Sequence, residues 1–312
     1  MSDLGFRGAD AIHEALRDRK IEPLPSVRTI NRILERRGAL DGQKRTRRPP
    51  PPPGWHLPEV ASKQRELDSF DVVEGLVIKG GPQVEVLNGI SLHGGLAASW
   101  PVEATVTAKV VVESMIEHWR AFGLPGYAQF DNDTIFQGPH ARPDVVGRVS
   151  RLCLSLGVVP VFVVPREFGF QSMIENYNGT WQAKVWARFD HGSLPDLQGQ
   201  SQRYVTALCR HRADRIESAP ERRAFPERWR LDLQSRPRGR IIYLRRTSGE
   251  GTVEALGRNF EVDQHWLHRL VRVEVDLDGD KIRIYRLRRR EPVDQPLLRE
   301  LHHQIKIGKF RE

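Results

Sequence analysis

The sequence predicts an α/β fold in which helices cover a mixed β-sheet, with a pair of short helices before it and a small all-β module after it. Three observations lead to this prediction. Strand and helix signals alternate over residues 64–190, two short amphipathic stretches lie within residues 1–40, and short arginine-rich strands occupy residues 236–290. A chain of 312 residues, 39% of them hydrophobic, is long enough to bury the core that this arrangement needs.

Residues 1–40 predict two short helices separated by a proline-containing break at residues 22–25. Ser26 is a suitable N-cap for the second helix. The outer face of that helix carries three polar or basic side chains, Arg28, Asn31 and Arg32. Such a pair fits a helix-turn-helix, whose second helix enters the major groove of DNA. A plain helical hairpin with a solvated charged face fits equally well.

Residues 41–63 predict a linker. A basic run at residues 44–48 is followed by five prolines at residues 49–53. A proline run adopts an extended helix of roughly 3 Å per residue and acts as a semi-rigid spacer. The basic run could lie along a phosphate backbone, or it could simply be solvated.

The predicted core, residues 64–190, begins with three strands separated by glycine-rich turns and then alternates helix and strand. Its predicted elements are strands 66–73, 83–90 and 96–100, helix 105–122, strand 127–130, helix 143–156, strand 158–164 and a helix over 173–181. The run of β-branched residues at 158–164 is typical of a strand buried on both faces. The order predicts a mixed sheet whose first three strands form a meander.

Three further segments follow the core. Residues 191–235 predict a polar, largely helical connector, and residues 291–312 form a basic tail. Between them, residues 236–290 predict short strands, with a hairpin turn at residues 278–280, and hence a small β-barrel or sandwich. Its scattered arginines suit contacts with phosphates, which hold DNA without reading its sequence.

Composition restricts the classes of protein. The net charge of +9 favours a polyanionic partner, although basic surfaces also occur on ordinary enzymes. The two cysteines, Cys153 and Cys209, are far apart and lack partners at metal-ligand spacing, which argues against a zinc site or a disulfide framework. No stretch is long and apolar enough to span a bilayer, and the first residues do not resemble a signal segment. We therefore expect a cytoplasmic protein without a membrane partner.

Four carboxylates stand at notable positions in the predicted core. Asp68 and Asp71 lie inside the first strand, Asp131 ends the fourth strand, and Glu175 lies in the last helix. Strand interiors disfavour aspartate, so a carboxylate there usually has a ligand or a paired charge. Asp68 and Asp71 compete for one role, because a step of three residues along a strand changes the face. Taken alone, Asp131 is also explained by a simple turn.

The stretches around these carboxylates resemble the retroviral-integrase-like core of DDE transposases from bacterial insertion sequences. The resemblance rests on Leu67-Asp68 through Glu74-Gly75, on Asp131-Asn132-Asp133 with Phe136, and on Pro165 followed by Glu175 and Asn178. It covers about residues 64–189. Two positions depart from the family pattern: Asp133 replaces the usual glycine, and Arg65 stands where many relatives have tryptophan.

The resemblance implies an RNase H-like core, flanked by an N-terminal helix-turn-helix and a C-terminal DNA-binding barrel. It further implies a polynucleotidyl transferase that joins the ends of a mobile element to target DNA. We would expect such a protein to form a homo-oligomer on DNA in the bacterial nucleoid. A non-catalytic DNA-binding protein derived from a transposase is the main alternative, and a nuclease of the same fold is a third possibility.

By this resemblance Asp68, Asp131 and Glu175 are the catalytic residues and the ligands of two Mg²⁺ ions, and the motif favours Asp68 over Asp71. The chemistry is consistent, because two such ions stabilise charge on the attacking and leaving oxygens and Mg²⁺ prefers oxygen ligands. Asn178 and Gln182 share a helix face with Glu175 and are expected to touch DNA, unless that face is only a solvated one.

Overall fold

The computed structural model describes residues 9–37, 51–138, 143–167, 169–305 and 310. The chain divides into two units, Met1–Pro50 and Pro51–Glu312, and each is described by itself. The basic run at residues 44–48 and the first two prolines lie outside the described residues. None of the described helices has the length and apolar character needed to cross a membrane.

The first unit contains the two predicted helices, α1 (Ala9–Asp18) and α2 (Val27–Arg36). Ser26 caps α2 as predicted, because its side chain accepts a hydrogen bond from the Thr29 backbone N–H at 3.2 Å. The connection, residues 19–26, is longer than the roughly three- or four-residue turn of a helix-turn-helix. The helix pair is therefore confirmed, and its assignment as a helix-turn-helix stays a prediction.

The second unit is built on one mixed sheet of nine strands in the order β11-β10-β9-β6-β5-β4-β1-β2-β3, counted over the described residues. Its first part is the predicted core: an antiparallel meander, then two strands parallel to the first. These strands are β1 (Leu67–Val77), β2 (Gln83–Ser91), β3 (Ala97–Glu103), β4 (Tyr127–Phe130) and β5 (Val159–Phe162).

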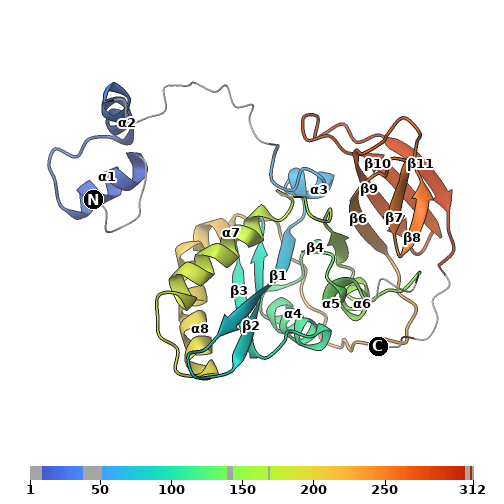
Figure 1. Ribbon diagram of the computed structural model, residues 1–312, viewed down its shortest axis with the longest axis horizontal. Coiled ribbons are helices and arrows are strands. Elements are labelled where there is room, and N and C mark those ends of the chain that lie inside the picture. The colour runs from blue at the N-terminus through green and yellow to red at the C-terminus, as the bar shows by residue number, and fades with distance from the viewer. Residues whose placement is uncertain (1–8, 38–50, 139–142, 168, 306–309, 311–312) are drawn as a thin grey trace. The chain divides into compact units, whose positions relative to one another are not determined.

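Helices cover both faces of this part of the sheet (Figure 1). On one face, Phe70 and Leu87 pack in a cluster with residues of α4 and α6. On the other face, Val73 and Val86 pack in a cluster with residues of α7 and α8. Alternate residues of β1 thus serve opposite layers, as the pleat requires. The helices are α4 (Ala108–Phe122), α5 (Thr134–Gln137), α6 (Arg148–Ser155), α7 (Ser172–Trp181) and α8 (Leu194–His211).

The C-terminal strands extend the core sheet. Strand β6 (Arg240–Arg246) pairs in parallel with β5, and β9, β10 and β11 follow in antiparallel order. Their bounds are Leu270–Asp276, Lys281–Arg286 and Leu297–His302. A separate two-stranded sheet holds β7 (Thr252–Ala255) and β8 (Arg258–Glu261). The separate barrel predicted for residues 236–290 is not confirmed, because among the described strands β6 continues the ladder of the core.

One hydrophobic cluster runs through this junction. The ring of Phe162 on β5 stacks on Tyr243 of β6, with 5.3 Å between the centroids, and Val273 of β9 belongs to the same cluster. Without β6, the β5 edge would present unpaired backbone groups and apolar side chains to water. The strands after residue 236 therefore complete the core sheet.

Some helices also differ slightly from the sequence prediction. The helix expected from residue 143 begins at Arg148, and α7 continues into a π-helical turn, Gln182–Trp186. The short helices α3 (Pro58–Ala61) and α9 (Ala213–Glu217) and the strand β11 complete the described elements.

Candidate active site

The register between β1 and β4 selects Asp71 as the neighbour of Asp131. The two strands run parallel, with Asp68 opposite Ala128 and Ser69 opposite Gln129. Two residues further in the same register, Asp71 is level with Asp131. The side chains of Ser69 and Gln129 meet on one face, at 3.4 Å between Oγ and Nε2. Asp71 and Asp131 follow them by two residues and so belong to that same face.

Helix α7 covers this face and brings the third carboxylate. Glu175 is exposed in its first turn, and Asn178 lies one turn later. The Asn178 side chain donates from Nδ2 to Oδ2 of Asp71 at 2.7 Å. A helix from one segment thus presents Glu175 toward a pair of aspartates held by two strands.

The electrostatics of the two aspartates show mutual repulsion. Burial and the negative charge of Asp131 raise the pKa of Asp71 to about 6, and the charge of Glu175 adds to this rise. Burial also raises the pKa of Asp131, and the charges of Asp133 and Glu74 act in the same direction. Over the part of the chain that the structure describes, no lysine, arginine or histidine lies within ion-pair distance of Asp71, Asp131 or Glu175. A cation from outside would relieve this repulsion.

The three side chains fit Mg²⁺ by donor type, since carboxylate oxygens are the ligands that this ion prefers. Their uncompensated charge fits as well. However, no group of three or more His, Cys, Asp or Glu side chains within the described residues is gathered closely enough to enclose a metal ion. Mg²⁺ commonly keeps several waters, so one or two carboxylates can anchor it.

The turn after β4 is fixed by its own polar groups. Oδ1 of Asp131 accepts the backbone N–H of Asp133 at 2.9 Å, and Asn132 donates from Nδ2 to the Val163 carbonyl at 2.7 Å. Asp133 points elsewhere and caps α5, accepting the Ile135 N–H at 2.8 Å. Asp131 therefore takes part in a turn after β4 and, at the same time, lies in the candidate active site, so the two explanations of this residue do not exclude each other.

Asp68 lies apart from this site. Its side chain is 1% exposed and faces α4, where it accepts a hydrogen bond from Trp119 Nε1 at 3.0 Å. The Arg222 guanidinium binds both its oxygens, at 2.8 and 2.6 Å. Burial alone would raise the pKa of Asp68, but Arg222 holds it below its usual value. The structure does not bring Asp68 close to Asp131 and Glu175. Asp68 precedes Asp71 by three residues along β1, so its side chain lies on the opposite face of the sheet.

The sequence motif favoured Asp68, although both aspartates lie in one strand ahead of the Glu74-Gly75 pair. The distinguishing contact comes from Arg222, which is 154 residues away from Asp68 along the chain. Only the partner strand and this distant arginine assign a face to each aspartate.

Asn178 is also placed differently from the expectation. It is 9% exposed, and its Oδ1 accepts from Asn88 Nδ2 at 2.8 Å while its Nδ2 bonds Asp71. The Asn88 Oδ1 accepts from Ser99 Oγ at 2.6 Å, and Ser99 Oγ lies 2.7 Å from the Tyr177 hydroxyl. Both groups of the Asn178 amide are thus used inside the protein, in a polar chain that joins β1, β2, β3 and α7. Sequence reasoning did not identify Asn88, Ser99 or Tyr177.

The remaining candidates for DNA contact are exposed. Gln182 begins the π-helical turn after α7 and is exposed. Arg28, Asn31 and Arg32 are exposed on α2 of the first unit. Their roles stay predictions.

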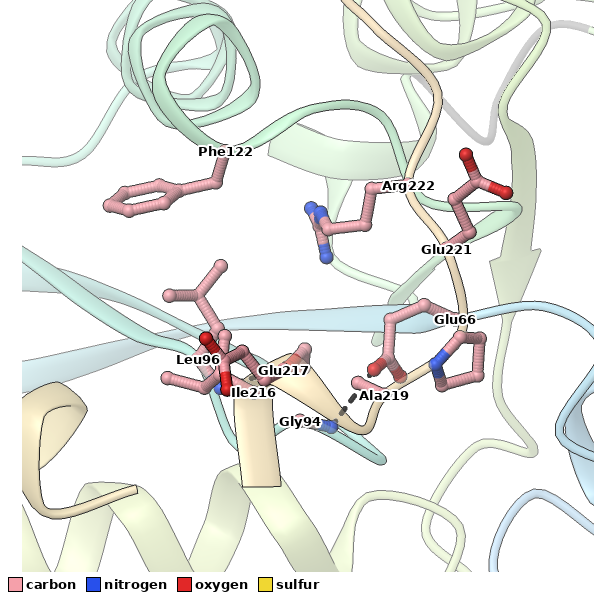
Figure 2. Close-up of a pocket in the computed structure, with 11 residues that line it drawn as sticks. Glu66, Gly94, Leu96, Phe122, Ile216, Glu217, Ala219, Glu221 and Arg222 are labelled. Carbon is pink, nitrogen blue, oxygen red and sulfur yellow. Dashed lines mark hydrogen bonds between the residues drawn. The ribbon is translucent and has the colours of Figure 1, made fainter. Parts of the chain in front are cut away.

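A cavity of about 270 Å³ is lined in part by Arg222, the ion-pair partner of Asp68 (Figure 2). Arg222 and Glu66 line it, together with apolar side chains that include Phe122. The Glu66 carboxylate accepts backbone N–H groups of Leu67, His93 and Gly94 at 2.9–3.0 Å. Glu66 and Arg222 are therefore satisfied by the protein itself, unlike the carboxylates around Asp71.

No family model matches the chain, and no curated protein matches it. Among solved structures it is similar to the catalytic core domain of BIV integrase, with a TM-score of 0.33 and 16% identity, over 42% of this chain and 78% of that chain. It is similar to a chain of the simian T-cell lymphotropic virus intasome in complex with PP2A regulatory subunit B56 gamma, with a TM-score of 0.39 and 12% identity, over 86% and 85%. It is also similar to the HTLV-2 integrase catalytic core domain in complex with magnesium, with a TM-score of 0.35 and 13% identity, over 45% and 82%. At these TM-scores we draw neither fold nor activity from the likenesses.

Proposed function

We propose that the chain is a metal-dependent polynucleotidyl transferase that joins the ends of a mobile element to target DNA. One observation carries the proposal: Asp71, Asp131 and Glu175 come from β1, the end of β4 and α7, and the charges of Asp131 and Glu175 raise the pKa of Asp71, with no lysine, arginine or histidine at ion-pair distance among the described residues. The order of these carboxylates along the chain also agrees with the transposase motifs. In this proposal Asp71 takes the role that the motif spacing favoured for Asp68.

Asp71, Asp131 and Glu175 would hold two Mg²⁺ ions. When bound, such ions stabilise charge on the attacking and leaving oxygens of a phosphodiester and lower the pKa of the attacking hydroxyl. The protein's own part is positioning. Asn178 orients Asp71, and the Asp133 N–H holds one oxygen of Asp131.

DNA is the proposed partner, with a homo-oligomer assembled on it. The net charge of +9 supports a polyanionic partner. Arg28, Asn31 and Arg32 on α2 would read bases at the element ends, and Gln182 would meet DNA near the carboxylates. The connections between the C-terminal strands also present arginines around Trp266, with guanidinium carbons of Arg269 and Arg288 at 4.7 and 5.2 Å from its ring centroid.

A strand-transfer gel with Mg²⁺ tests the proposal. Asp71→Asn, Asp131→Asn and Glu175→Gln should each abolish joining while the protein still binds DNA. Asp133→Asn is the matched control, because Asn is as good an N-cap as Asp and should leave joining intact. Near-normal joining by any of the three variants would remove that residue from the site.

The alternative is a non-catalytic DNA-binding protein derived from a transposase. It is favoured by the absence, among the described residues, of three metal-ligand side chains close enough to enclose an ion. Titration of Mg²⁺ or Mn²⁺ against the melting temperature separates the two functions. An unchanged melting temperature, together with DNA binding but no joining, would favour the alternative.

A further inference from the structure

One arginine of the C-terminal strands is buried within the core sheet. Arg245 on β6 is 7% exposed, and its guanidinium carbon lies 5.0 Å from the Tyr243 ring centroid. Its Nη1 donates to the carbonyls of Val163, at 3.1 Å, and Leu244, at 2.9 Å. Burial lowers the pKa of Arg245 to about 10, although the charge of Glu254 on β7 acts in the opposite direction.

Arg245 differs from the other buried or partly buried arginines considered in this unit, Arg151, Arg222 and Arg272. Arg222 is paired with Asp68, and Arg272 lies 3.0 Å from Glu274. Arg151 has no such pair within the described residues, but its Nε and Nη1 donate to three backbone carbonyls. Within the described part of the chain, Arg245 has no carboxylate at ion-pair distance and no acceptor for Nε or Nη2. These two nitrogens are not fully buried, so they remain accessible to solvent.

The guanidinium of Arg245 lies at the turn that follows β4. The Val163 carbonyl that accepts from Arg245 also accepts from Asn132 Nδ2, at 2.7 Å. Asn132 follows Asp131 directly, so the guanidinium lies beside the turn that presents this carboxylate. A strand of the C-terminal segment therefore delivers a positive charge to the end of β4.

We infer that Arg245 binds a phosphate group of DNA beside the turn that follows β4; the inference rests on the proposed function. A buried cation without a partner is costly, and an anion supplied by a ligand removes that cost. The donors left over, Nε and Nη2, form one edge of the guanidinium, and such an edge can meet two oxygens of one phosphate. The ligand is thus a backbone phosphate, which Arg245 would position without reading the sequence.

Binding titrations over a range of salt concentrations test this inference, with a random-sequence DNA duplex as the probe. Arg245→Gln removes the charge and can still donate to one carbonyl, and Arg245→Met removes both. Either variant should bind about tenfold more weakly or worse, and the log–log salt slope should flatten by about 0.9 for the one lost phosphate contact. Arg120→Gln is the control, because it removes one exposed positive charge from the last turn of α4 and should leave the slope unchanged.

The outcomes separate the inference from the proposed function. If either folded variant of Arg245 binds the duplex with the affinity and slope of the wild type, Arg245 is only a structural residue and the inference fails, while the proposed function stands. A melting temperature raised in Arg245→Met with an unchanged slope would have the same meaning, since an unpaired buried charge destabilises the fold. If the wild-type chain binds no duplex at all, the inference and the proposed function both fail.

Discussion

Neutralising the ion pair between Asp68 and Arg222 tests which aspartate of β1 is needed for DNA joining. Asp68→Asn leaves the Arg222 guanidinium buried without its carboxylate, with a side chain that is only 14% exposed. Removing one partner of a buried pair costs about 3–5 kcal/mol, and for a unit of this size the melting temperature should fall by roughly 10 °C. The double variant Asp68→Asn/Arg222→Gln removes both charges, so it should be more stable than the single variant.

Asp71→Asn should behave in the opposite way. A pKa of about 6, against an ordinary value of 3.8, corresponds to at most roughly 3 kcal/mol of destabilisation by the charged carboxylate. The neutral amide removes this repulsion, so the variant should melt higher than the wild type at pH 7.5 in EDTA. It should nevertheless join no DNA.

The assays are thermal melts in EDTA and a strand-transfer gel with Mg²⁺, run below the melting temperature of every variant. We expect the double variant at Asp68 and Arg222 to join DNA and Asp71→Asn to be inactive. The reasoning is refuted if the folded double variant loses joining while Asp71→Asn retains it. That result would return Asp68 to the site.

Three further predictions follow from the same contacts. Without divalent metal, Asp71 should stabilise the wild type less as pH rises from about 4 to about 6, because its raised pKa favours the folded state fully only below that range, and the melting temperature of the wild type should therefore fall relative to that of Asp71→Asn in pH-dependent melts. Asn88→Ala leaves Asn178 with an unpaired buried carbonyl oxygen, so it should cost about 1–3 kcal/mol in urea unfolding and lower joining more than DNA binding; unchanged joining would deny Asn88 a positioning role. Deleting residues 236–312 exposes the β5 edge and part of the core, so we expect an insoluble or unfolded product; a soluble product with a cooperative melt would mean that the first five strands fold alone.

Most of the elements could be predicted from the sequence, because their signals are local. Alternation of apolar residues identified the meander β1–β2–β3, and Ser26 was identified as the cap of α2 from its residue type and place. The positions of two candidate site residues were also predicted: Asp131 ends a strand, and Glu175 lies in the helix that follows the last core strand. Each of these predictions depends on only a few neighbouring residues.

The tertiary structure decided what depends on distant pairing. The face of Asp71 follows from the register between β1 and β4, and the neutralisation of Asp68 follows from Arg222 in a connector far along the chain. The position of the C-terminal strands also depends on distant pairing. Short alternating strands have the same sequence pattern whether they close a separate barrel or add to the edge of a sheet, and only the pairing of β5 with β6 distinguishes these cases. A sequence specifies which side chains a strand offers, whereas the partner strand determines what each side chain meets.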